Sequence, residues 1–450
     1  MVGTQPAMST SRLSQRGRTT CDLALPVAAL LVAALPASAQ SAIDTTLARE
    51  YVSEVRALAA RTDTLWKVRT LGALLFVEPR TRQVVASQAD SAGLLLAQGA
   101  LFVGTLPDAL PIANTAVTLG GTRYAMLMWP LPADRGARVR LLLHESFHRV
   151  QDQLRLPAAN PSNVHLGTTA ARIWTRLEWR ALAEALLRSG TQRVQALSDA
   201  LAFRAMRLRT YPQAQSEEQA LLLNEGLAEY NGWASSGEAD SLLARRVALA
   251  MLARERQESL VRSFAYASGP AYGVLLDGSG MAWRPQLNAG SDLAELLRVA
   301  YPTVRVDTTR MLQRSERHGG LLIRAEENEM DARRAETERG HRVRLVEQPV
   351  VRIPTTDSLS YSFNPNDAFP LAGHGTVYGS GQFTDVWGTL RVARNGVLLK
   401  QGAGVPSEVV VPGPAADRPS LSNGSWTLTL APGWTLREGA RVGDWVVVRQ

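Results

Sequence analysis

Two histidines four residues apart, with a glutamate directly after the first, have the types and spacing to bind a metal ion and activate water. They are His144, Glu145 and His148, in the segment LLLHESFH. Side chains four residues apart project from one face of a helix, so both imidazoles can reach a single ion. Glu145 is rotated by about 100° around the axis, where a general base would hold a water. The segment predicts a zinc site on a helix; two ordinary helical histidines are the alternative.

A second segment supplies a third ligand, which a catalytic zinc site needs in addition to an open position for water. Its sequence, NEGLAEY, runs from Asn224 to Tyr230, in a helix that we expect to begin at Ser216 with Gln219 as its capping-box partner. Glu225 would complete a set of two histidines and one glutamate. Glu229, one turn later, could accept the free ring N–H of a ligand histidine and fix its tautomer. A carboxylate paired with an arginine is the alternative for Glu229.

The HExxH segment followed by a helix carrying Asn-Glu-Gly-x-Ala-Glu-Tyr resembles the gluzincin metallopeptidases, the group of thermolysin and aminopeptidase N. The resemblance implies that His144, His148 and Glu225 are the zinc ligands and that Glu145 is the catalytic base. It also implies that Glu229 is the acid that supports a ligand from one turn beyond the glutamate. The general pattern resembles the family over about residues 124–230, whereas the residues themselves match only within the two motifs.

The chain departs from that family in the spacing of the motifs. Seventy-six residues separate His148 from Glu225, far more than in the best-known gluzincins, and no Gly-Ala-Met-Glu-Asn segment is present to bind a substrate amino terminus. The pattern of the insertion predicts helices over 169–187 and about 194–208. Because of this insertion, Glu178 stays an alternative third ligand, although an ion pair is the more ordinary role for it.

Metallopeptidases use a tyrosine or histidine to stabilise the oxyanion that forms when water attacks a carbonyl. The segment from Tyr266 to Gly273 contains small residues that allow close approach to a ligand. Tyr272 is the first candidate for the oxyanion role and Tyr266 is the second. A tyrosine packed in a helix, with its hydroxyl satisfied locally, is the alternative for each.

Short strands precede the predicted zinc helix, and Asp134 is its expected N-cap. Apolar alternation predicts one hairpin from 74–77 and 83–86, and a second from 115–119 and 124–129. The strand 124–129 runs directly into the helix. The resemblance suggests that it is an edge strand that binds the substrate backbone by strand addition, although its apolar side chains fit a core strand equally well.

The remaining pattern predicts an α+β fold: a small mixed sheet, a mainly helical metallopeptidase core and a C-terminal all-β, sandwich-like module. An amphipathic helix is expected over 43–67, and further helices over 240–256 and 258–276. Asn395-Gly396 is a signal for a two-residue hairpin turn. The expected divisions are a signal peptide (1–39), a metallopeptidase domain (40–323, with its sheet at 72–130 and helices at 134–300), a charged linker or helix (324–342) and a β-rich accessory domain (343–450).

The amino terminus has the features of an export signal. Arginines precede an apolar run from Leu23 to Leu35, and a small-x-small pattern predicts cleavage after Ala39. The run is too short to span a bilayer comfortably, so no stable membrane insertion is expected after cleavage. The one cysteine, Cys21, precedes the run and would be removed. We expect a secreted or periplasmic protein without disulfides.

Composition fits a globular protein with a substantial core: 450 residues, 45% hydrophobic and 20% charged. The net charge of +8 is almost wholly arginine, because Lys67 and Lys400 are the only lysines. No basic run interleaved with aromatics is present, so a nucleic-acid partner is not expected. The expected partner is a peptide or protein substrate.

These observations together predict an exported zinc metallopeptidase. Zinc lowers the pKa of its water, Glu145 takes the proton as the water attacks a peptide carbonyl, and zinc with Tyr272 carries the developing charge. Two alternatives are a zinc amide hydrolase acting on cell-wall peptides and a catalytically silent exported binding protein that retains the scaffold. The intact Glu145 weighs against the silent protein, since binding needs no base there. The sequence contains no Gly-x-Ser-x-Gly elbow and no phosphate-binding loop.

Overall fold

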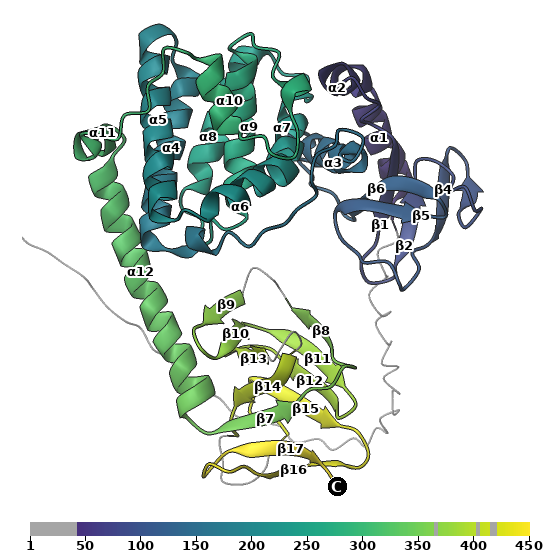
Figure 1. Cartoon of the computed structure of the whole chain (residues 1–450). Coiled ribbons are helices and arrows are strands. Elements are labelled where there is room, and N and C mark those ends of the chain that lie inside the picture. Colours follow the sequence, from purple (N-terminus) through teal and green to yellow (C-terminus); the bar gives the residue numbers. More distant parts are fainter. Residues whose placement is uncertain (1–42, 364–367, 402–405, 415–420) are drawn as a thin grey trace, which may run out of the picture. The chain divides into compact units, whose positions relative to one another are not determined.

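A computed structural model describes residues 43–363, 368–401, 406–414 and 421–450 of the chain (Figure 1). The predicted signal peptide and its cleavage point lie outside these residues. Within the described ranges, every helix is too short or too polar to cross a membrane. The α+β class is confirmed: a small sheet and a set of helices are followed, after Glu347, by strands.

The first sheet has the spatial order β3-β4-β2-β1-β6-β5, and its pairs are antiparallel except for the parallel β1 and β6. Both predicted hairpins are confirmed, as β1 with β2 and as β5 with β6. The strand bounds are β1 Ala73–Val77, β2 Gln83–Ala86, β3 Leu96–Gln98, β4 Leu101–Thr105, β5 Thr115–Leu119 and β6 Thr122–Met128.

The central strands β1 and β6 are buried on both faces, as their near-continuous apolar sequences require. Leu74 and Phe76 share a core with helix α1 (Thr45–Arg56) and helix α3 (Arg135–Val150), and Figure 1 shows α3 beside β5 and β6. The predicted helix over 43–67 is broken into α1 and α2 (Ala59–Trp66). The break has a packing reason: α1 packs on the sheet, whereas Trp66 at the end of α2 belongs to the core of the helical part.

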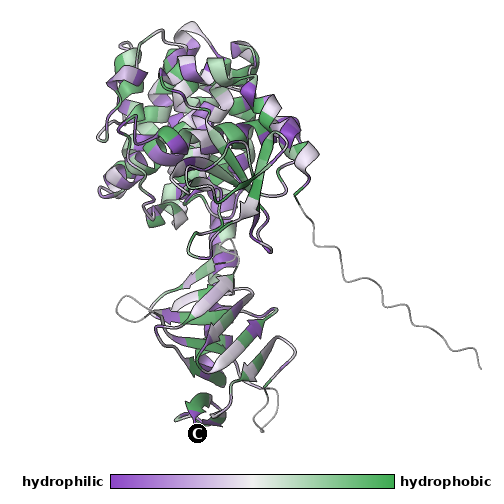
Figure 2. Cartoon of the chain, turned by 90° about the vertical axis from the view of Figure 1, so that its right-hand side faces the viewer, coloured by the Kyte–Doolittle hydropathy of each residue, from purple (hydrophilic) through white to green (hydrophobic). Residues whose placement is uncertain are grey.

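The helical part begins after α3 and carries both hydrophobic and hydrophilic residues on its helices (Figure 2). Helix α4 has the predicted bounds, and the charged segment forms a long helix, α12. Ser216 lies inside α6 and is not its N-cap. The bounds are α4 Thr169–Leu187, α5 Gly190–Thr210, α6 Ala214–Leu221, α7 Leu227–Ala234, α8 Asp240–Arg254, α9 Ser263–Asp277, α10 Leu293–Ala300, α11 Met311–Arg317 and α12 Gly320–Arg342, with short 3-10 turns at Val164–Gly167 and Arg284–Gln286.

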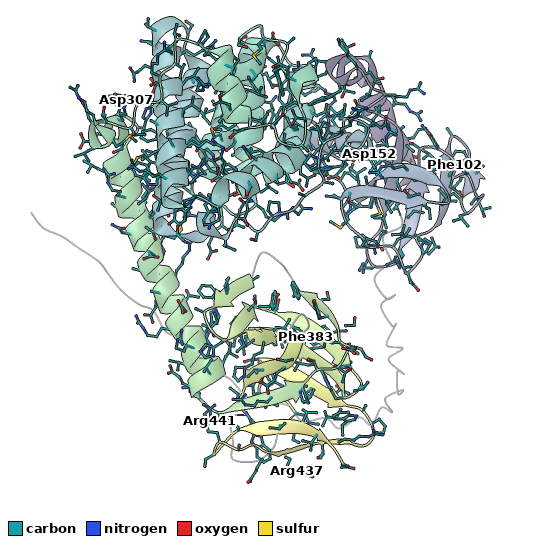
Figure 3. All side chains as sticks on the ribbon, in the orientation of Figure 1. Phe102, Asp152, Asp307, Phe383, Arg437 and Arg441 are labelled. Carbon is teal, nitrogen blue, oxygen red and sulfur yellow. The ribbon has the colours of Figure 1, made fainter. Side chains whose placement is uncertain are left out.

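The C-terminal strands form two sheets that share one hydrophobic core, which confirms the predicted sandwich. Phe383 of one sheet, labelled in Figure 3, packs in that core with Val409 of the other. The sheet orders are β16-β17-β7-β14-β13-β10-β9 and β15-β12-β11-β8. The bounds are β7 Val350–Pro354, β8 Ser360–Phe363, β9 Ala368–Leu371, β10 Gly375–Tyr378, β11 Gly381–Asp385, β12 Gly388–Val392, β13 Val397–Gln401, β14 Pro406–Pro412, β15 Trp426–Leu430, β16 Trp434–Glu438 and β17 Trp445–Arg449.

The hairpin predicted at Asn395-Gly396 is wrong in one respect. Both residues have the positive φ of the expected turn, 65° and 81°. The strands that it joins, β12 and β13, belong to different sheets. The local turn preference is met, but β12 pairs with β11 and β15, so the chain passes from one sheet to the other at this point.

A buried ion network ties three helices of the helical part together. Arg207 of α5 is fully buried between Glu178 of α4, at 2.5 Å, and Glu218 of α6, at 2.7 Å. His165 lies 2.9 Å from Glu218 on its other side. Burial raises the pKa of Glu218, but the charge of Arg207 outweighs it and lowers that pKa to about 2.

We predict that Arg207→Met lowers the free energy of unfolding by about 3–5 kcal/mol near neutral pH, because it leaves two buried carboxylates without their cation. The folded-state pKa of Glu218 lies below its unfolded value of 4.5, so its contribution is complete above pH 4.5 and is lost as the pH falls toward 2. The gap between wild type and variant should therefore shrink in acid. Urea unfolding between pH 3 and 7 checks this, with the exposed Arg209→Met on the same helix as control. A gap that stays constant with pH would contradict it.

Candidate metal centre

Helix α3 presents its two histidines side by side at the bottom of a cleft. Its N-cap is Asp134, whose carboxylate accepts from the Ala137 amide as predicted. His144 and His148 bring their Nε2 atoms to within 3.2 Å of each other. Val139 and Leu142, on the opposite side of the helix, are buried in the core that α3 shares with the first sheet. The apolar side of α3 therefore fixes the direction of the histidine side.

Glu225 joins the two histidines from a π-helical turn, Leu222–Gly226, which interrupts the helix between α6 and α7. Its Oε2 lies 3.4 Å from Nε2 of His144 and 3.7 Å from Nε2 of His148. Such turns recur at functional sites, because one extra residue re-aims a side chain. The three residues form a group that could hold a metal ion.

Gln151 fixes the tautomer of His148. Its Oε1 lies 2.8 Å from Nδ1 of the histidine, while its amide nitrogen donates to the carbonyl of Pro157 and to Oδ1 of Asn224. Because two acceptors occupy the nitrogen, Oε1 must be the end that faces the ring. Nδ1 of His148 therefore carries the proton, and Nε2 presents a lone pair.

Glu229 fixes the tautomer of His144, as predicted. Its Oε2 lies 3.1 Å from Nδ1 of that ring, and its Oε1 accepts from the indole N–H of Trp233 at 3.2 Å. A carboxylate accepts only, so Nδ1 of His144 carries a proton and Nε2 is the nitrogen that faces Glu225. Burial lowers the pKa of His144, but the hydrogen bonds that its ring donates to Glu225 and Glu229 outweigh burial and raise that pKa to about 10. A metal ion would therefore displace a proton from Nε2 and bind its lone pair.

Three lone-pair donors thus converge on one point, and the donor set fits a divalent transition metal. Separations of 3.2, 3.4 and 3.7 Å between the ligand atoms compare with edges of about 3.3 Å for a tetrahedron with bonds of 2.0–2.1 Å. Two unprotonated nitrogens and a carboxylate oxygen at these distances repel one another unless a cation or a proton lies between them. Two imidazoles and one carboxylate form an open, three-ligand set.

Glu145 lies beside this group and is buried. Among the described residues, nothing forms a hydrogen bond with its Oε2, and burial raises its pKa. A buried carboxylate oxygen without a partner is costly, and a role in proton transfer is one explanation for such a group in a cleft. Its position after His144 places it on the wall of the same cleft.

Tyr266, not Tyr272, lies at the site. The hydroxyl of Tyr266 donates to Oε2 of Glu225 at 2.5 Å, and its ring stacks parallel to that of His144 at 5.5 Å. Tyr272 is fully buried and donates to Glu178 at 2.6 Å, so the oxyanion role predicted for it is wrong. Six residues correspond to a rotation of about 240° along α9, which turns the two rings to different sides.

Glu178, the alternative third ligand, is also placed elsewhere. Its carboxylate is fully buried and is shared between Arg207 and Tyr272. The metal-binding group contains Glu225 and not Glu178. The more ordinary role expected for Glu178, an ion pair, is the one that the structure gives it.

The cleft has a volume of about 760 Å³ and is bounded by α3, by the π-helical turn, by Tyr266 and by the start of β5. The predicted edge strand, 124–129, is wrong: it corresponds to β6, which lies between β1 and β5. The edge strand next to β6 is β5, and Thr115 and Ala116 of β5 line the cleft. The parallel pairing of β1 with β6 places β6 inside the sheet.

A close crossing of two helices holds the π-helical turn in place. A Cβ on Gly269 of α9 would lie 2.3 Å from the Cα of Gly226, so position 269 needs glycine, and a Cβ on Gly226 would be tight at 3.2 Å from the Cα of Gly269. The small residues of α9 were expected to approach a ligand, but they approach the backbone next to Glu225. Asn231, which sequence reasoning missed, donates to the carbonyl of Leu143 and so joins α7 to α3. Gln151 was also missed, although its position one turn after His148 could have revealed it.

Comparisons with known proteins add no family assignment. No protein-family model, no curated protein and no solved structure matches the chain. The likeness to gluzincins therefore consists of the two motifs.

We predict that Gly269→Ala weakens metal binding and lowers stability by about 1–3 kcal/mol, because the new methyl group overlaps the backbone beside Glu225. Zinc affinity from chelator competition and thermal unfolding measure the two effects. Gly278→Ala, at the end of the same helix, is the matched control, since its Cβ would meet other atoms at 3.5 Å or more. Unchanged zinc affinity in Gly269→Ala would show that this crossing does not position the ligand.

Proposed function

We propose that the chain is a zinc-dependent metallopeptidase that hydrolyses peptide bonds with Glu145 as the general base. The observation that carries the proposal is the convergence of three lone-pair donors beside a buried carboxylate oxygen that has no partner among the described residues. The cleft in which they lie gives access to a substrate. This combination is typical of metal-assisted hydrolysis.

Zinc is the proposed metal because of the donor set. Imidazole nitrogen and a single carboxylate suit zinc, and an open fourth position distinguishes a catalytic site from a structural one. When bound, zinc would lower the pKa of a water ligand and polarise a carbonyl oxygen. His144, His148 and Glu225 would hold it, with Glu229 and Gln151 orienting the two rings.

Glu145 would accept the proton of the attacking water and deliver it to the departing amine. Its raised pKa, caused mainly by burial, brings its basicity closer to what proton transfer near neutral pH requires. Tyr266 would act on the ligand carboxylate, since its hydroxyl already donates to Glu225. We assign Tyr266 to positioning Glu225.

The substrate backbone would add to the free edge of β5. Thr115 and Ala116 line the cleft at this edge, next to the metal-binding group. An exposed edge offers main-chain N–H and C=O groups to an extended peptide independently of its sequence. Together with the expected signal peptide, this supports an exported enzyme acting on peptides or proteins.

The metal assignment predicts about one zinc per chain in the wild type and a sharp loss in Glu225→Ala, because that variant removes one of three ligands. Metal analysis of the purified, dialysed proteins measures this. Glu217→Ala, on the same helix but outside the metal-binding group, should keep its zinc. Equal zinc content in Glu225→Ala and wild type would exclude the assigned ligand set.

Glu145→Gln should bind zinc like the wild type and lose turnover by at least about a hundredfold, since glutamine keeps the shape but cannot accept the proton. Hydrolysis of a quenched fluorescent peptide library, beside zinc content, measures both effects. Turnover that survives in zinc-loaded Glu145→Gln would overturn its role as the base. A wild type that binds zinc but cleaves no peptide would overturn the proposed function.

A further inference from the structure

Arg140 lies in the cleft one turn before His144, with its charge uncommitted. It is half-buried, and its guanidinium stacks on the ring of Trp233 at 4.2 Å. Within the described part of the chain, no group accepts a hydrogen bond from it or forms an ion pair with it within 4 Å. An arginine has five N–H donors, so this residue brings unused hydrogen-bonding capacity into a partly desolvated site.

The carboxylate that attracts Arg140 most strongly is already occupied. Glu229 exerts an attraction on Arg140, but its two oxygens are engaged by His144 and Trp233. The same tryptophan therefore holds Glu229 with its N–H and supports Arg140 with its ring. Arg140 thus lines the cleft beside the metal-binding group, with its guanidinium supported by the ring of Trp233.

The charge of the cleft also favours an anionic ligand. Its lining contains three glutamates and three arginines, so a bound divalent metal would give the cleft a net positive charge. The other two arginines are partly committed: Arg123 donates to main-chain carbonyls, and Arg262 lies 3.4 Å from Glu225. Among the described residues that line the cleft, Arg140 is the arginine whose guanidinium is available to bind a carboxylate.

The distance of Arg140 from the metal-binding group limits which substrate residue it could bind. Helix geometry separates the Cα atoms of Arg140 and His144 by about 6 Å along the axis. The guanidinium reaches back one further turn, since a Cβ on Gly136 would lie 3.2 Å from its Nη1. An extended peptide advances about 3.3 Å per residue, so a carboxylate bound by Arg140 would belong to a residue within about four positions of the cleaved bond.

We propose that Arg140 is a specificity-determining residue that binds a substrate carboxylate, so that the enzyme prefers peptides with a carboxylate close to the cleaved bond. The carboxylate is either an acidic side chain or the C-terminal carboxylate of the peptide. The inference rests on the proposed peptidase function and adds the class of substrate to it.

The test uses the zinc-loaded protein and two series of quenched fluorescent peptides. In the first series, amidated peptides differ by Asp or Glu against Asn or Gln at each position around the cleaved bond. In the second, neutral peptides end in a free carboxylate or an amide. In at least one of the two series, the peptide that carries the carboxylate should be cleaved with a kcat/KM about 10- to 100-fold higher than that of its neutral partner. This is the range expected for hydrogen bonds to a charged group.

Substitutions then assign the preference to Arg140. Arg140→Met keeps an apolar chain over Trp233 and should reduce the acid-to-neutral ratio to about one. Arg140→Lys keeps the charge without the fork and should retain part of the ratio. Arg135→Met is the matched control, because it removes an arginine from the same helix that lies outside the cleft and pairs with Glu54.

Binding gives a second readout that does not depend on turnover. In the Glu145→Gln background, fluorescence anisotropy of labelled peptides should show that Arg140→Met weakens binding of the acidic peptide and not of its neutral partner. If Arg140→Met lowers the thermal midpoint or the zinc content, the Lys variant decides the question.

The outcomes separate this inference from the function on which it rests. Absence of cleavage for every peptide would overturn the proposed peptidase and this inference with it. Cleavage without any preference for the carboxylate would overturn the inference alone. A preference that survives unchanged in Arg140→Met would also overturn it, because the carboxylate would then be bound elsewhere.

Discussion

The metal-binding group depends on the outer nitrogens of two imidazoles being held. Glu229 and Gln151 take these nitrogens of His144 and His148 at 3.1 and 2.8 Å, and each acceptor is itself fixed by another hydrogen bond. If either ring took the other tautomer, an N–H would point at Glu225 in place of a lone pair, and that nitrogen could not bind a cation. The ability of the cleft to bind a metal therefore depends on Glu229 and Gln151, which contact the ligand side chains.

The helices that carry this layer meet through their backbones. A Cβ on Gly232 of α7 would lie 2.8 Å from the carbonyl oxygen of Arg140 in α3, and Gly226 meets Gly269 as closely. Asn231 donates to the carbonyl of Leu143 between the same two helices and accepts from Trp66. Helices whose backbones are in direct contact can shift less than helices that are separated by long side chains. The ligands on the two helices therefore keep a fixed position relative to each other.

Local patterns were sufficient for the parts of the site that a single helix determines. The spacing of His144 and His148 and the cap at Asp134 depend only on helical periodicity, and both were predictable. Tyr272 failed because the rotation of α9 about its axis is set by packing against other helices, which no short segment of sequence encodes. The strand 124–129 was misplaced for a similar reason, since its interior position comes from a parallel pairing with a strand about fifty residues earlier.

The π-helical turn at Leu222–Gly226 sets the rotation of α7 about the helix axis relative to that of α6. Before it, α6 turns Glu218 toward Arg207; after it, α7 turns Asn231 toward α3. In an uninterrupted α-helix, the directions of Glu218, Glu225 and Asn231 would all follow from a fixed rotation of 100° per residue. The extra residue in the turn uncouples them, so the ligand, the buried ion network and the joint with α3 each take the direction they need. Insertions or deletions of a single residue within this turn would therefore alter the ligand set, whereas the same change in the loop after α7 would leave it intact.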